Sequence, residues 1–113
     1  MKHKVVLVPF PFDDLSSTKV RPAVCLTEPI GEHKHIVLAF ITSRVPETPL
    51  STDLVFIETD KDFPSTGLRV PSALQLHRMM TVSTNIIVRE LGHLPTSKQK
   101  EVEGKLKVLF GIK

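Results

Sequence analysis

Tryptophan and tyrosine are absent from this chain, and only six of its 113 residues are phenylalanine. Proteins that bind long single strands of nucleic acid by stacking bases on aromatic rings usually carry more of these residues. If this chain binds nucleic acid, we therefore expect it to contact a short segment.

Cysteine is almost absent too. Cys25 is the only one, so no disulfide can form within the chain. We expect Cys25 to lie in the core and the protein to be cytoplasmic. No apolar run approaches the roughly 20 residues of a membrane-spanning helix. No small-residue cleavage site follows the basic start, so we expect neither a membrane span nor a signal peptide.

Glycine-rich phosphate loops and zinc-ligand spacings are also missing. His33 and His35 stand two apart with no third ligand nearby in the sequence, and we interpret them as exposed turn residues. Asp13 and Asp14 are interpreted as part of a solvated loop. We accordingly expect no metal and no other cofactor.

The composition is that of one globular domain, spanning residues 1–113. Hydrophobic residues make up 41% of the chain and charged residues 24%. The formal net charge is +3 and the isoelectric point about 9.2. A mildly basic protein suits a partner made of phosphates, but proteins with other partners share this property.

Short apolar segments separated by turn residues run through most of the chain. We expect strands at residues 4–10, 20–26, 36–41, 53–58, 72–82 and 85–92. This succession predicts a mainly β fold, a small barrel made from a closed or strongly coiled antiparallel sheet.

The last segment has helical periodicity instead. We expect a helix that begins with a capping box of Thr96 and Gln99 and ends at Gly111. The apolar residues of its buried face fall at helical intervals, and they are Val102, Leu106, Leu109 and Phe110.

Arg21 is the first candidate for chemistry, because its guanidinium opens an otherwise apolar strand. In a hairpin centred on residues 31–32, Ile30 faces His33 and Arg21 faces Thr42. Directly paired side chains share a face, with Cβ atoms roughly 5 Å apart. A guanidinium matches two phosphate oxygens and a hydroxyl can reach a third. The pair predicts a phosphate site suited to RNA cleavage; the alternative is a surface arginine at a strand start.

His77 is the second candidate. Arg78 beside it favours a neutral imidazole, which can take up a proton at pH 7. Gln75 shares its face by strand alternation and can hydrogen-bond a base or sugar. The alternative interpretation is a partly buried, inert histidine. We also predict substrate contacts from the side chains of Phe12, Lys19, Ser43, Gln75 and Arg78.

Several motifs, in this order along nearly the whole chain, resemble those of the MazF/PemK toxins of type II toxin–antitoxin systems. They are VLVPFPFDDL at 6–15, RPAV at 21–24, FITS at 40–43, PSAL at 71–74, TV at 81–82 and LGHL at 91–94.

The resemblance implies an SH3-like β-barrel with a C-terminal helix that works as a homodimer. It implies sequence-specific, metal-independent endoribonuclease activity that leaves a 2',3'-cyclic phosphate and a 5'-hydroxyl. Arg21 and Thr42 match residues treated as catalytic in the family, and His77 stands where some members have an aspartate as general base. An antitoxin would cover the RNA groove, and the toxin–antitoxin complex would bind operator DNA.

The chain departs from the family pattern in places. His3 and Lys4 replace the usual Gly-Asp, the loop before Arg21 is short, and Arg78 stands where glutamine is common. The RNA sequence preference therefore does not carry over. Two other functions stay open: a CcdB-like gyrase poison that acts through its C-terminal residues, and an inactive relative that only binds RNA or antitoxin.

Overall fold

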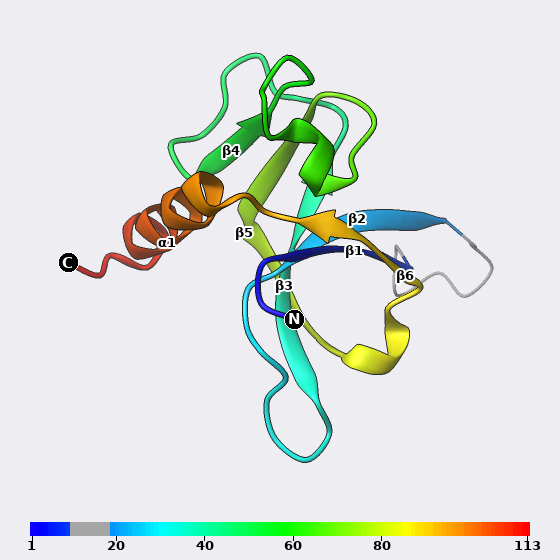
Figure 1. Cartoon of the computed structure of the whole chain (residues 1–113). Helices are drawn as coiled ribbons and strands as arrows, with labels where there is room; N and C mark the ends of the chain where they lie inside the picture. Colours follow the sequence, from blue (N-terminus) through cyan, green and yellow to red (C-terminus); the bar gives the residue numbers. More distant parts are fainter. Residues whose placement is uncertain (10–18) are drawn as a thin grey trace.

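Six antiparallel strands form one curled sheet in the computed structural model, which describes residues 1–9 and 19–113 (Figure 1). The order across the sheet is β4-β5-β3-β2-β1-β6. The strands are β1 (Lys4–Pro9), β2 (Val20–Cys25), β3 (His35–Thr42), β4 (Asp53–Phe56), β5 (Ser72–Ser83) and β6 (Arg89–His93). The predicted fold class, a mainly β fold with a C-terminal helix, is confirmed.

The last two predicted strands differ in outcome. Strand β5 runs from Ser72 to Ser83, close to the prediction. The strand expected at 85–92 begins only at Arg89, because a 3-10 turn, η2 (Thr84–Ile86), intervenes. The Ser83 hydroxyl accepts the Asn85 N–H at 3.2 Å and so caps that turn before pairing with β1 resumes.

The curled sheet buries a separate apolar cluster on each of its faces. One cluster packs against α1 (Thr96–Phe110) and includes Val5, Leu74, Leu94 and Val102. The other lies on the opposite face and includes Val6, Val8, Cys25 and Phe40. The successive residues Val5 and Val6 therefore serve opposite faces, as strand alternation requires.

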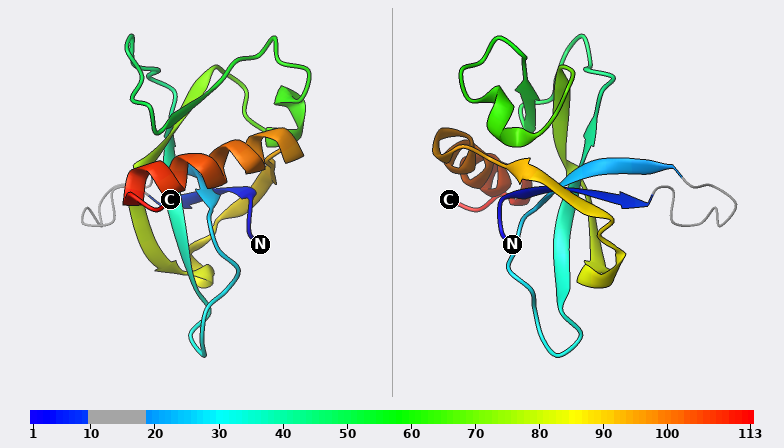
Figure 2. Two further views of the ribbon diagram at one scale, coloured as in Figure 1. Left: turned by 90° about the vertical axis from the view of Figure 1, so that its left-hand side faces the viewer. Right: turned by 45° about the vertical axis from the view of Figure 1, so that its right-hand side comes forward.

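Helix α1 lies across one side of the sheet (Figure 2). It begins at Thr96 as predicted, but the capping box is wrong: Pro95 is the N-cap, and the Gln99 side chain donates to the Leu94 carbonyl at 2.8 Å. Gly111 ends the helix in the left-handed conformation, as expected. Phe110, predicted to be buried, is 60% exposed.

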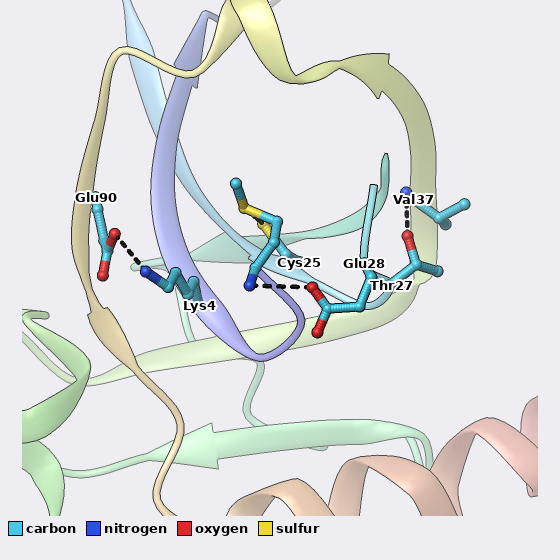
Figure 3. A network of polar contacts seen from close by, with 7 residues as sticks. Lys4, Cys25, Thr27, Glu28, Val37 and Glu90 are labelled. Atoms are coloured by element: carbon cyan, nitrogen blue, oxygen red, sulfur yellow. Dashed lines mark hydrogen bonds and ion pairs between the residues drawn. The ribbon is translucent and has the colours of Figure 1, made fainter. Parts of the chain in front are cut away.

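Three contacts tie down the start of the chain (Figure 3). The Met1 amino group lies 3.2 Å from Glu28 Oε1, and its hydrogen bond lowers the pKa of that carboxyl. The Cys25 thiol donates to the Met1 sulfur at 3.7 Å. Lys4 Nζ donates to Glu90 Oε2 at 2.9 Å and links β1 to β6. No helix in the described part of the chain is both long and apolar enough to cross a membrane.

Candidate functional site

The register between β2 and β3 is the one expected from the hairpin. Ala23 pairs with Phe40 and Cys25 with Leu38, which is the predicted alignment. The ladder ends at Ala23, and beyond it the two strands diverge (Figure 1). Arg21 and Thr42 thus stand two residues past the last pair, where β2 and β3 separate, and they do not belong to the ladder.

The predicted turn of this hairpin is wrong. Ile30 pairs with His35 and not with His33, and residues 31–34 make the turn between them. Gly31 and Lys34 both take positive φ angles, of 72° and 54°. Glycine adopts that conformation without strain, but a lysine side chain does so rarely. The turn is therefore two residues longer than the one assumed, while the strands beyond it keep their alignment.

A cavity of about 410 Å³ opens where β2 and β3 separate. Among the described residues that line it are three arginines and two serines. Its walls are formed by Leu7, Arg21, Pro22, Ile41, Ser43, Gly67, Leu68, Arg69, Val70, Ser72, Arg89 and Leu91. Three cations in one lining favour an anion as the ligand.

The sheet topology explains how two of these arginines come together. Strand β1 lies between β2 and β6. Arg21 on β2 pairs with Val8, and Arg89 on β6 pairs with Leu7. The two residues therefore stand on either side of the far end of β1, although 68 positions separate them in the sequence (89 − 21).

The third arginine, Arg69, lines the cavity because its segment of backbone lies close to β6. Arg69 lies in the segment between η1 (Phe63–Thr66) and β5. Gly67 opens that segment with a φ of 73°, and a Cβ there would collide with the carbonyl oxygen of Leu91 on β6. Only glycine lets the segment lie this close to β6, and Arg69 and Arg89 both line the cavity.

Ser43, predicted to bind substrate, lines this cavity, and Thr42 does not. Thr42 pairs with Ala73 on β5. Its Oγ1 accepts the N–H of Arg44 at 3.1 Å. That bond uses a lone pair of the oxygen, so the hydroxyl proton can still be donated to an anion.

The other predicted side chains gather on β5 at an irregularity. Ala39 pairs with Met79 and Ile41 with Leu74, so residues 75–78 bulge opposite Phe40 alone. Gln75, His77 and Arg78 belong to this bulge, which re-aims side chains locally. His77 is outside the cavity lining, and its Nδ1 lies 4.0 Å from Oδ1 of Asp53 on β4.

Two further predictions concern the start of β2. Lys19 is exposed directly before that strand. Phe12, with the Asp13 and Asp14 loop, falls in residues 10–18 and lies outside the described residues. Cys25 is buried as expected, and burial raises the pKa of its thiol to about 11, which keeps it in the unreactive neutral form.

Sequence reasoning missed Arg69 and Arg89. A usable signal was present, because Arg89, like Arg21, stands at the start of a strand. A charged residue opening a strand marks the rim of a sheet, where a ligand can approach. What the sequence lacked was the neighbour relation between β1 and β6.

The sequence of the chain matches a family of toxins. A family model described as PemK-like, MazF-like toxin of type II toxin–antitoxin systems matches residues 2–110. No curated protein matches in sequence.

Several solved structures share the fold. MazF-mt6, a toxin of Mycobacterium tuberculosis, superposes with a TM-score of 0.72 at 19% identity over 97% of this chain and 98% of that one. A mycobacterial endoribonuclease in complex with its cognate antitoxin gives 0.70 at 11%, over 100% and 94%. The MazE–MazF structure from Deinococcus radiodurans gives 0.70 at 18%, over 99% and 95%.

Proposed function

This chain belongs to the PemK-like, MazF-like toxin family of type II toxin–antitoxin systems, and from that premise we propose that it is a sequence-specific endoribonuclease. The observation that carries the proposal is the cavity where β2 and β3 diverge. Its lining combines three guanidinium groups with serine hydroxyls. Such a lining favours a phosphodiester, and RNA supplies phosphodiesters in series.

The proposed reaction needs no metal, because the arginines can supply the charge that stabilises the transition state. The 2'-oxygen of the RNA attacks the adjacent phosphorus, and the bond from phosphorus to the 5'-oxygen breaks. A base takes the 2'-hydroxyl proton, and the leaving 5'-oxygen takes a proton from water. The products are a 2',3'-cyclic phosphate and a 5'-hydroxyl.

The roles of individual residues follow from their chemistry. A guanidinium scarcely deprotonates, so Arg21 stabilises the phosphate oxygens as negative charge develops on them. Thr42 donates a hydrogen bond from its hydroxyl to the same phosphate. Ser43, Arg69 and Arg89 hold a neighbouring part of the RNA backbone in the cavity. His77 is the candidate base, and Gln75, Arg78, Lys19 and Phe12 are candidate contacts to the rest of the substrate.

Partners follow from the family and from the related structures. We propose that the chain forms a homodimer in the cytoplasm and is inhibited by a cognate antitoxin. An acidic antitoxin segment would compete with RNA for the arginines of the cavity. The toxin–antitoxin complex would bind operator DNA.

The test is cleavage of a mixed-sequence RNA pool by the purified protein in excess EDTA. Cutting is expected, and Arg21→Ala should slow it by about 10²- to 10³-fold, the typical loss for one donor to a developing oxyanion. Lys100→Ala, which removes a cation from the exposed face of α1, should cut normally.

Other outcomes separate the alternatives. Intact RNA together with trapped gyrase–DNA complexes would replace this function with a gyrase poison acting through residues 110–113. Tight antitoxin binding with neither effect would identify an inactive relative.

A further inference from the structure

Asp53, the first residue of β4, carries a buried carboxylate that is only half satisfied. Its side chain is 1% exposed. Oδ2 accepts the N–H of Leu50 at 2.9 Å and so holds the turn before β4. Oδ1 is buried without a hydrogen-bond partner among the described residues. A buried carboxylate oxygen left in this state costs free energy, so a nearby donor should be drawn to it.

His77 offers a donor close to that oxygen. Its Nδ1 lies 4.0 Å from Asp53 Oδ1, across the β4–β5 pairing that joins Asp53 to Gln75. The imidazole is 40% exposed, so one side of the ring meets the buried carboxylate while part of the ring stays accessible. Hydrogen bonds of this kind are often long before substrate binds and shorten in the complex.

We propose that Asp53 is a positioning residue for His77 in RNA cleavage. The carboxylate accepts a hydrogen bond from Nδ1–H, which fixes the imidazole in one tautomer and orientation and leaves Nε2 as the free acceptor. Nε2 then takes the proton of the attacking 2'-hydroxyl while the P–O5' bond breaks. The Asp53 side chain then accepts a hydrogen bond from the imidazolium that forms. The inference rests on the proposed function.

The sheet places this pair in reach of the phosphate residues. Thr42 pairs with Ala73, and alternation along β5 puts Gln75 and His77 on the same face. Strands β5, β3 and β2 are consecutive, so at the level of the Ala23–Phe40 pair two strand spacings, about 10 Å, separate β5 from β2. Arg21 lies two residues beyond that level, where β2 and β3 diverge. A ribose with its phosphate, together with the long arginine side chain, would bridge that gap.

The β5 bulge shortens the remaining distance along the strands. Residues 75–78 all lie opposite the single residue Phe40 along the ladder. His77 therefore lies near the level at which Phe40 pairs with Ala23 on β2. In a regular ladder His77 would lie four positions, about 13 Å, beyond the level of Thr42. The bulge in β5 therefore brings His77 closer to the point where β2 and β3 separate.

Asp53→Asn tests the proposal with almost no change of shape. The amide oxygen can still accept the Leu50 N–H, but the amide nitrogen would donate to His77 Nδ1 and force the proton onto Nε2. Glu58→Gln is the matched control, because it removes one negative charge from an exposed site just after β4.

The direct readout is the tautomer of His77, measured on the wild-type protein by two-bond nitrogen–proton correlation of its imidazole. The signal among the five histidines is assigned by its loss in His77→Gln. A proton on Nδ1 in the wild type and on Nε2 in Asp53→Asn is expected. A wild-type proton on Nε2 overturns the proposal without any variant having to fold.

RNA cleavage is the second readout. Asp53→Asn should cut about 10- to 100-fold more slowly, a typical loss for a residue that orients another, and Glu58→Gln should match the wild type. Adding Asp53→Asn to His77→Gln should cause no further loss. Equal rates for Asp53→Asn and an active wild type would refute this inference alone. A wild-type protein that cuts no RNA would refute the proposed function, and the catalytic role of Asp53 with it.

Discussion

Removing two of the cavity arginines should change how RNA binding responds to salt. Arg69 and Arg89 are exposed and line the cavity, so Arg69→Gln with Arg89→Gln should leave the fold intact. Each phosphate neutralised on a single strand contributes about 0.7 to the slope of log affinity against log salt. If each arginine holds one phosphate, the double variant should have a slope that is smaller by about 1.4.

That slope change sets the size of the expected effect. Between roughly 50 mM and 200 mM salt, a fourfold change, a slope difference of about 1.4 corresponds to a factor of about seven. The affinity lost through the two substitutions should therefore be about sevenfold larger at the lower salt concentration. Fluorescence anisotropy with a pool of short 2'-O-methyl RNA measures this, because that RNA lacks the attacking hydroxyl.

A matched control is available on the helix. Lys100→Gln with Lys107→Gln removes the same charge from exposed positions of α1 that do not line the cavity. This variant should keep nearly the wild-type slope. If both double variants lower the slope equally, the effect belongs to net charge, and the cavity is not the place where phosphates bind.

Two further predictions concern stability. Gly92→Ala should destabilise the folded protein by about 1–3 kcal/mol, because the new Cβ would collide with the carbonyl oxygen of Ser65. Gly104→Ala should stabilise the folded protein by about 0.5–1 kcal/mol, because a Cβ at this position of α1 meets no other atom. Urea unfolding measures both changes, and the reverse order of stability would contradict this packing. Burial lowers the pKa of His3 below 6.5 in the folded protein, so the unfolded chain binds more protons at His3 as the pH falls. The folded state is therefore more stable above pH 6.5, and it loses this contribution as the pH falls through the folded pKa. His3→Gln should flatten that dependence in thermal unfolding, and an unchanged profile would rule His3 out as its source.

The alignment of the β2–β3 hairpin could be predicted from the sequence because it depends on local counting. Ala23 opposite Phe40 follows from the two apolar runs and their separation. The turn could not be predicted, since a lysine with positive φ at position 34 leaves no compositional mark. The register was correct although the turn was wrong, because a longer turn and an irregular stretch before it can leave the paired strands in register.

The helix shows the same limit at its two ends. Its length and its buried residue Val102 follow from helical periodicity. Phe110 fits that periodicity as well, but it is exposed, whereas Leu109 beside it packs against the core cluster. Whether an apolar residue is covered depends on how far the neighbouring element extends, which a local pattern does not contain.

The candidate site was only partly predictable for a related reason. Arg21 could be singled out because it opens a strand of otherwise apolar residues. Arg69 and Arg89 join it only through the β1–β6 pairing and the approach of Gly67 to Leu91. Asp53 meets His77 only through the pairing of β4 with β5. These are long-range relations between distant segments.

The chemical ends of the RNA products test the central claim most directly. Mass spectrometry of fragments made in EDTA should show 2',3'-cyclic phosphates and 5'-hydroxyls, the products of attack by the neighbouring 2'-hydroxyl on a phosphate held by Arg21. Fragments with 3'-hydroxyls and 5'-phosphates, or cutting that appears only when a divalent metal is added, would contradict the proposed mechanism.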